Sequence, residues 1–71
     1  MKLRWEQRPD GAWIAYGARK NDTVEKVMGK ILPPDKERDH WFWLFVDENI
    51  AGGGFNVDWI KDYMERMVVH Q

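Results

Sequence analysis

The residue types and spacings that catalysis needs are scarce in this chain. It contains no cysteine and no serine, and its single threonine, Thr23, lies where a helix is expected to begin. His40 and His70 lie in unrelated sequence contexts, and neither has a nearby set of carboxylates or hydroxyls that would orient a general base. The acidic residues are scattered rather than paired. We therefore expect a protein that is not an enzyme and that needs no metal or cofactor.

One glycine-rich stretch suggests a different kind of site. The sequence AGGGFN, residues 51–56, precedes an expected helix, and free amides at a helix N-terminus attract phosphate. The stretch lacks the Gly-Lys-Ser/Thr ending of a P-loop, and Asp58 in the first helical turn would repel a phosphate. We therefore interpret Gly52-Gly53-Gly54 as a flexible connection.

Charge is distributed unevenly along the chain. Residues 1–20 contain five basic and two acidic residues, whereas residues 41–71 contain two basic and five acidic residues. Either the two regions pack together and partly neutralise each other, or each is a surface for a partner of opposite charge. A nucleic-acid surface would use the cations on or beside the first expected hairpin, whose phosphate contacts would supply affinity. These candidate nucleic-acid-binding residues are Lys2, Arg4, Arg8, Arg19 and Lys20.

A run of six large apolar residues lies within DHWFWLFVDE, residues 39–48. In a strand, Trp41, Trp43 and Phe45 share one face and the residues between them share the other. Either both faces are covered and the segment is core, or one face is exposed and contacts a partner. Tryptophan is a typical anchor of protein interfaces. The candidate protein-binding residues are Trp41, Trp43, Phe45, Asp47 and Glu48.

The first element that must position these residues is a β-hairpin over residues 2–18. Residues 2–8 alternate loosely between apolar and polar side chains. Pro9 presets a bend and Asp10-Gly11 is a tight-turn signal. The following AWIAYGA is rich in aromatic and β-branched residues, which favour a returning strand.

Residues 22–32, DTVEKVMGKIL, are ambiguous. From Val24 to Ile31, apolar residues recur at the i, i+3, i+4 and i+7 spacing of a helix. Asp22 suits a helix N-cap, and Pro33 would end the helix. We predict a helix here, and the alternative is a strand.

The remaining elements complete a single small α+β domain over residues 1–71. Residues 40–47 predict a strand, and residues 57–69 predict an amphipathic helix with Asn56 as its N-cap. The expected order is ββαβα around a three-stranded antiparallel sheet, or ββββα if residues 22–32 form a strand. No apolar run approaches the ~20 residues that span a bilayer, and the absence of cysteine fits a reducing compartment, so we expect a cytoplasmic protein.

A short segment carries a resemblance to a known family. RPDGAWIAYG, residues 8–17, resembles the first hairpin of the arm-type DNA-binding domains of phage tyrosine integrases, through Asp10-Gly11, Trp13 and Ala15. Small uncharacterised phage and prophage proteins have similar hairpins. The resemblance implies a three-stranded sheet, backed by a helix, that reads DNA with the sheet.

Composition favours a protein partner over nucleic acid. The net charge is −1 and the pI is near 6.1, below the values typical of dedicated nucleic-acid binders, and five tryptophans suit a protein interface. We therefore predict a non-enzymatic protein-interaction module, such as a phage-encoded protein that binds and inhibits a host RNA polymerase or nuclease. Nucleic-acid binding through the basic hairpin is the alternative, and homodimerisation is a third interpretation.

Overall fold

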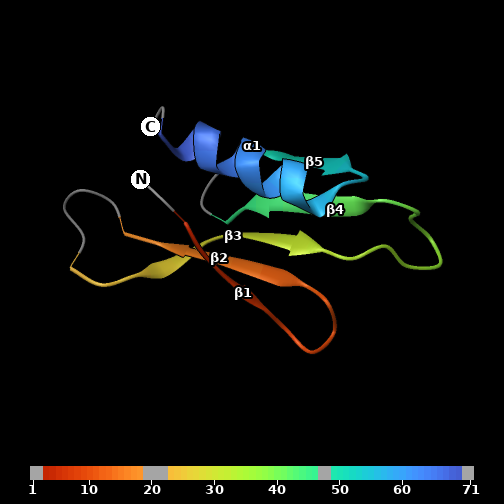
Figure 1. Ribbon diagram of the computed structural model, residues 1–71, viewed down its shortest axis with the longest axis horizontal. Coiled ribbons are helices and arrows are strands. Elements are labelled where there is room, and N and C mark those ends of the chain that lie inside the picture. The colour runs from red at the N-terminus through yellow and green to blue at the C-terminus, as the bar shows by residue number, and fades with distance from the viewer. Residues whose placement is uncertain (1–2, 19–22, 47–48, 70–71) are drawn as a thin grey trace.

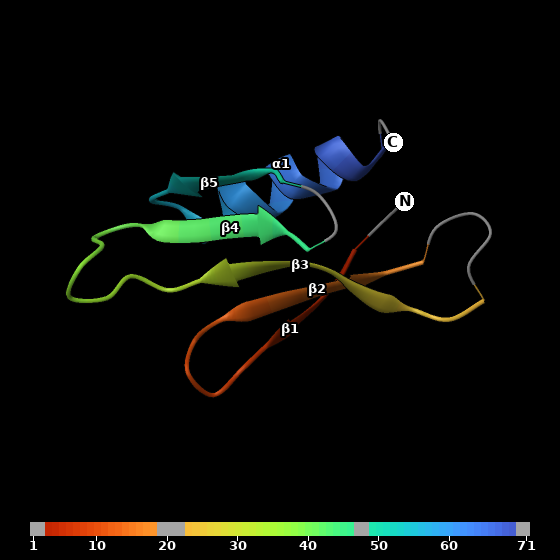
Figure 2. The same cartoon turned by 180° about the vertical axis from the view of Figure 1, so that it is seen from behind.

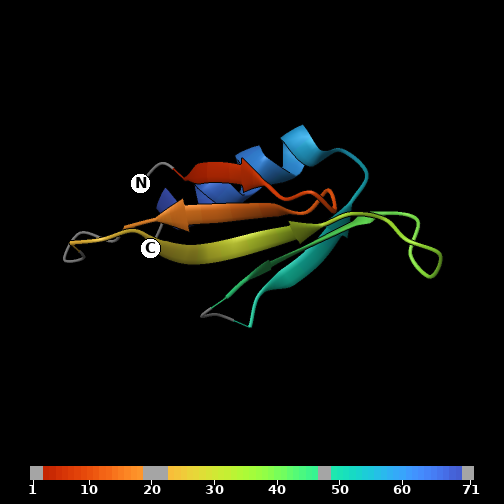
Figure 3. The same cartoon turned by 90° about the horizontal axis from the view of Figure 1, so that it is seen from below.

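The computed structural model describes residues 3–18, 23–46 and 49–69, and it is a small, compact α+β domain (Figure 1). In this described part, five strands precede one helix. Each strand pairs antiparallel with the next, so β1 and β5 form opposite edges of the sheet (Figure 2). The helix α1 lies on one face of the sheet (Figure 3). The elements are β1 Arg4–Gln7, β2 Trp13–Gly17, β3 Lys26–Leu32, β4 Trp41–Phe45, β5 Ala51–Gly54 and α1 Val57–Val69.

The prediction of a helix over residues 22–32 is wrong, because Lys26–Leu32 forms the central strand β3, as in the alternative order. Its residue Ile31 lies opposite Trp13 on β2 and Trp43 on β4, so backbone pairing on both sides outweighs the helical pattern. The pattern itself arises from a β-bulge. The register of β2 and β3 shifts between Ala15 and Tyr16, which leaves Met28 as the extra residue and interrupts the two-residue alternation.

The sheet has five strands rather than three, and residues 51–54 are not a flexible connection. Ala51–Gly54 pairs with β4, with Gly52 opposite Trp43. Glycine is a poor strand former in general, but a Cβ on Gly52 would lie 2.7 Å from Cζ2 of Trp43. The indole can lie on β5 because this position has no side chain.

Elements with strong local signals form where the sequence predicts them. The first hairpin closes at Gly11, which has a φ of 94° that glycine adopts without strain, and Oδ1 of Asp10 accepts a hydrogen bond from the amide of Ala12 at 2.9 Å. The final helix begins at Val57, and Oδ1 of Asn56 caps it by accepting a hydrogen bond from the amide of Trp59 at 3.0 Å.

The core lies between the sheet and α1. Ile60, Met64 and Val68 project from the helix onto a sheet face that includes Trp43 and Phe45. Removing such side chains from water is the main source of stability for so short a chain. Among the described residues, no helix is long and apolar enough to cross a membrane.

One flank of α1 is fixed to the first hairpin. The indole Nε1 of Trp5 donates a hydrogen bond to Oε1 of Glu65 at 3.1 Å, and Nζ of Lys61 lies 3.1 Å from the ring centre of Trp13. Burial lowers the pKa of Lys61 below its ordinary value of 10.5, while Asp58 and Glu65 oppose that shift.

The uncovered face of the sheet is shielded by long cationic side chains rather than by a second helix. The guanidinium of Arg4 lies 4.5 Å from the ring centre of Tyr16, and that of Arg38 lies 5.4 Å from the ring centre of Phe42. Phe42 is therefore half-buried, although no helix covers its face in the described structure.

Candidate functional site

The structure places the aromatic residues of the predicted protein surface beneath α1. Trp43 and Phe45 are 6% and 4% exposed, and Trp41 is half-buried against the same core. The side chains of Trp43 and Phe45 are therefore core, whereas Trp41 keeps part of its surface exposed. The other two members of the set, Asp47 and Glu48, lie outside the described residues.

The predicted nucleic-acid surface is not a free cluster of cations in the described structure. Nε of Arg4 lies 3.0 Å from Oε1 of Glu25, and its Nη1 lies 3.2 Å from Oε2 of Glu6. The hydrogen bond to Glu25 raises the pKa of Arg4, and Glu6 contributes in the same direction. Arg8 is exposed beside the hairpin turn. Lys2, Arg19 and Lys20 lie outside the described residues.

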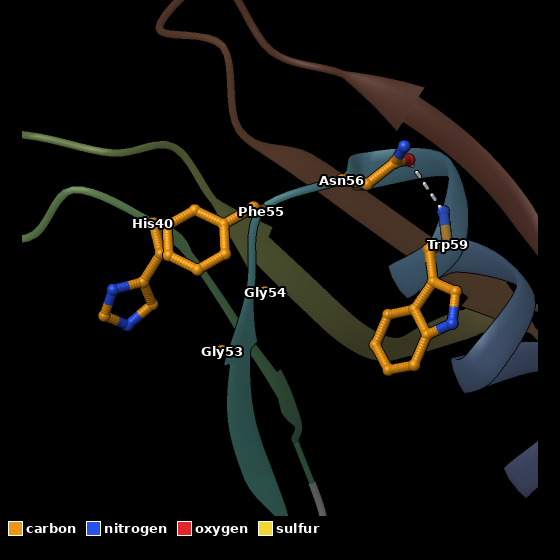
Figure 4. Close-up of a pocket in the computed structure, with 6 residues that line it drawn as sticks. All are labelled: His40, Gly53, Gly54, Phe55, Asn56 and Trp59. Carbon is orange, nitrogen blue, oxygen red and sulfur yellow. Dashed lines mark hydrogen bonds between the residues drawn. The ribbon is translucent and has the colours of Figure 1, made fainter.

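The most exposed large aromatic residues of the described structure gather where β5 leads into α1. Phe55 is 79% exposed and Trp59 is 56% exposed. Together with four neighbours they line a shallow, mainly apolar pocket of about 520 Å³ (Figure 4). The lining residues are His40, Gly53, Gly54, Phe55, Asn56 and Trp59.

Trp59 is held in position despite its exposure. Its indole stacks on the ring of Tyr63, with ring centres 5.3 Å apart and planes at 12°. Tyr63 in turn lies against the buried Trp43, with ring centres 5.4 Å apart. This row of aromatic rings connects an exposed indole to the core and restricts its motion.

A second aromatic pair lies on the other side of β5. Phe55 meets the imidazole of His40 edge to face, with ring centres 6.0 Å apart. A Cβ on Gly53 would lie 2.5 Å from Cδ2 of His40, so the imidazole rests directly on this glycine. Figure 4 shows His40 and Phe55 on one side of the glycine backbone and Trp59 on the other.

The backbone of β5 forms the floor between these two aromatic walls. The amide of Phe45 donates a hydrogen bond to the carbonyl oxygen of Ile50 at 3.0 Å. This bond shows that the backbone groups of Ile50 point toward β4, and it therefore determines the direction of the backbone groups of every residue in β5. Because these directions alternate along an antiparallel strand, Gly52 faces β4, whereas Ala51 and Gly53 direct their N–H and C=O groups to the outside. In the described part of the chain, no strand follows β5 in the sheet.

A carboxylate lies beside the pocket. Asp39 is exposed, and its Oδ1 lies 3.3 Å from Nδ1 of His40. Asp58, in the first turn of α1, is exposed but does not line the pocket, and it interacts with Lys61 on the flank that faces the first hairpin. The neighbouring Arg38 donates hydrogen bonds to the carbonyl oxygens of Pro33 and His40. Asp39 therefore places an exposed carboxylate beside one wall of the pocket.

The pocket presents features that suit the binding of another chain. Among the residues that the structure describes, no group of three or more His, Asp or Glu side chains is placed to hold a metal ion. The pocket offers aromatic rings, outward backbone groups and a neighbouring carboxylate, that of Asp39. Such features are suited to an apolar or cationic chain segment.

Sequence reasoning missed Phe55, Trp59 and His40 as site residues. One signal was available, because Trp59 falls outside the apolar stripe of the final helix, which Ile60 and Met64 define. An aromatic residue on the polar side of an amphipathic helix is a candidate contact residue. The position of His40 beside Phe55 depends on strand pairing and had no local signal.

No protein-family model, curated protein or solved structure matches the chain. The resemblance of residues 8–17 to the integrase hairpin therefore stays a prediction.

Proposed function

We propose that this protein is a non-enzymatic protein-interaction module that binds its partner at the β5 edge. The observation that carries the proposal is the exposure of Phe55 and Trp59 on opposite sides of a strand whose outer edge is unpaired in the described structure. Tryptophan held rigidly at a surface loses little conformational entropy on binding and buries a large area, so it often supplies most of the affinity.

The location differs from that expected from the sequence, but the class of function is the same. Trp41, Trp43 and Phe45 stabilise the domain, and the exposed aromatic residues at the β5 edge contact the partner. The role proposed from the sequence, inhibition of a larger host enzyme such as RNA polymerase or a nuclease, requires a binding surface of this kind and no catalytic group.

The electrostatics favour a protein partner over nucleic acid at this edge. Asp39 lies beside the pocket residue His40 and would repel phosphates. At the hairpin, Arg4 would have to leave Glu6 and Glu25 before it could bind a phosphate. Nucleic-acid binding through the hairpin is therefore the weaker alternative.

Selection from a library of displayed random peptides tests the proposal. Peptides of about eight residues suffice to reach along a strand of typical length. We expect peptides selected on the wild-type protein to bind Trp59→Ala about thirtyfold more weakly or worse, as for truncation of an interface anchor. Val24→Ala, which truncates an exposed apolar residue on the approach to β3, is the matched control and should bind as the wild type does.

Two kinds of result would contradict binding at the β5 edge. If no peptide is enriched, or if enriched peptides bind Trp59→Ala as well as the wild type, the β5 edge is not the interaction site. A short DNA duplex that binds with a steep salt dependence, and that is lost in Arg8→Glu but kept in Trp59→Ala, would establish the nucleic-acid alternative.

A further inference from the structure

The outer edge of β5 differs from the edges that natural sheets usually present. Unpaired strand edges attract other strands, and most proteins protect them with charged side chains, proline or bulges. β5 consists of one alanine and three glycines and has none of these protections. Ala51 and Gly53 direct their backbone groups outward, as the register with β4 requires.

From this edge we propose that an extended segment of the partner adds to the sheet as a strand beside β5. The inference rests on the proposed function and specifies its mode. Backbone hydrogen bonds to Ala51 and Gly53 supply the pairing, because an extended chain offers N–H and C=O groups at the matching spacing. The glycines leave no side chain on β5 that would hinder its approach.

The aromatic walls determine which side chains the added strand should carry. Successive residues of a strand point to opposite faces. One residue of the added strand therefore contacts Trp59 on the face that α1 covers, and the next contacts Phe55 and His40 on the other face. The preferred segment has apolar side chains at adjacent positions, one for each wall.

A carboxylate beside one wall bears on the charge of the segment. Oδ1 of Asp39 lies 3.3 Å from Nδ1 of His40, a pocket residue, and an exposed carboxylate there favours a lysine or arginine at one end of the bound segment. An arginine could also lie over the exposed indole of Trp59. The occupant is thus a short, extended, apolar segment that carries a basic residue.

The same features disfavour a second copy of this chain as the occupant. Pairing β5 with another β5 would place glycine against glycine, so no side chain would fill the aromatic walls. A different protein segment can supply the apolar side chains that such a pairing would lack.

Amide hydrogen exchange on the wild-type protein tests the mode directly. In the free protein we expect the amide of Gly52 to be protected by its bond to β4, and those of Ala51 and Gly53 to exchange rapidly. Saturation with a peptide selected in the display experiment should slow exchange at Ala51 and Gly53 about tenfold or more.

The possible negative results distinguish strand addition beside β5 from the more general proposal that the β5 edge binds a partner. A peptide whose binding depends on Trp59 but that leaves Ala51 and Gly53 unprotected overturns strand addition and keeps the proposed function. The absence of any Trp59-dependent peptide overturns the proposed function itself. If Ala51 and Gly53 become protected as protein concentration rises without peptide, the occupant is a second copy and the partner segment is ruled out.

Backbone substitution provides a second, independent test. Ala51→Pro removes one outward N–H without a direct effect on pairing with β4, and edge strands accept proline where the N–H faces solvent. We expect it to weaken peptide binding about fivefold to tenfold. Ala51→Val keeps the N–H and is the matched control. Equal binding by both variants contradicts the proposal.

N-methylation of the peptide covers the case in which Ala51→Pro does not fold. Methyl groups on the backbone nitrogens that face β5 should abolish binding to the wild-type protein, whereas methyl groups on the alternate nitrogens should be tolerated. If both methylated peptides bind alike, the contact is made by side chains and strand addition is wrong.

Discussion

The two edges of the sheet are built in opposite ways. β1 carries Arg4 and Glu6, which form an ion pair with each other, and Arg4 also reaches Glu25 beside β3. β5 carries nothing larger than the methyl group of Ala51. Charged side chains along β1 discourage another strand from pairing there, whereas β5 leaves its backbone accessible.

The comparison shows that the open edge is a consequence of core packing. The indole of Trp43 and the imidazole of His40 lie so close to β5 that Gly52 and Gly53 cannot carry side chains without a shift of these rings. Removing side chains from a strand to accommodate rings on both faces also removes the groups that would protect its edge. The glycine-rich composition of β5 therefore lets the rings pack against the strand and also leaves its outer backbone groups accessible.

The largest expected effect comes from removing the ring that shapes β5. Trp43→Ala should lower the free energy of unfolding by about 3–5 kcal/mol, because it leaves a large cavity between the sheet and α1. Urea unfolding followed by circular dichroism measures this effect. Trp59→Ala is the control, since its indole is more than half exposed and its loss should cost far less.

Adding a side chain to β5 should produce the next largest effect. Gly52→Ala places a methyl group 2.7 Å from Cζ2 of Trp43 and should cost about 1–3 kcal/mol of unfolding free energy. Gly54→Ala is the matched control, because its methyl group would lie 3.2 Å from Ile60, a looser contact.

A double-mutant cycle tests whether the cost of Gly52→Ala arises from contact with Trp43. Trp43→Phe removes the indole atoms that the new methyl group would meet, and also a buried Nε1 donor that has no partner in the described structure. In the Trp43→Phe background, Gly52→Ala should therefore cost less than about 1 kcal/mol. Equal costs in the two backgrounds would show that the glycine is not required by Trp43.

Removing the protection of β1 should have a small effect on stability and a larger one on association. Arg4→Thr with Glu6→Thr keeps strand-forming residues but removes both charges, so we expect a stability change within about 1 kcal/mol. Self-association should increase, as measured by sedimentation velocity. Glu25→Gln, which weakens the pairing of Arg4 but leaves the β1 charges in place, should remain as monomeric as the wild type.

The smallest expected effect is a pH dependence on the flank of α1 that faces the first hairpin. Burial against Trp13 and Trp5 lowers the pKa of Lys61 in the folded state below 10.5, so its charged form costs stability at neutral pH. The cost should diminish as the pH rises through the lowered pKa toward 10.5. Relative to Lys61→Met, the wild type should gain thermal stability over this range, and an unchanged or reversed difference would contradict the assignment.

The sequence by itself determined the elements whose signals are local. Asp10-Gly11 specifies the turn of the first hairpin because one residue supplies an acceptor and the other a positive φ. Asn56 specifies the start of α1 because its side chain caps the first turn. The aromatic run 41–45 specifies a strand, and the α+β class follows from these elements.

Tertiary structure decided what depends on residues distant in the chain. β3 is a strand because β2 and β4 pair with it on both sides, and a bulge at Met28 produced the helical spacing. β5 is a strand because Gly52 allows Trp43 to lie on it.

The location of the binding site was decided in the same way. A single helix covers one face of the sheet in the described structure, so Trp43, on that face, is buried, whereas Trp59, on the helix itself, is exposed. A side-chain pattern reports which residues share a face of one element. Which face is covered, and which edge stays unpaired, depends on the contacts between elements that form when the chain folds.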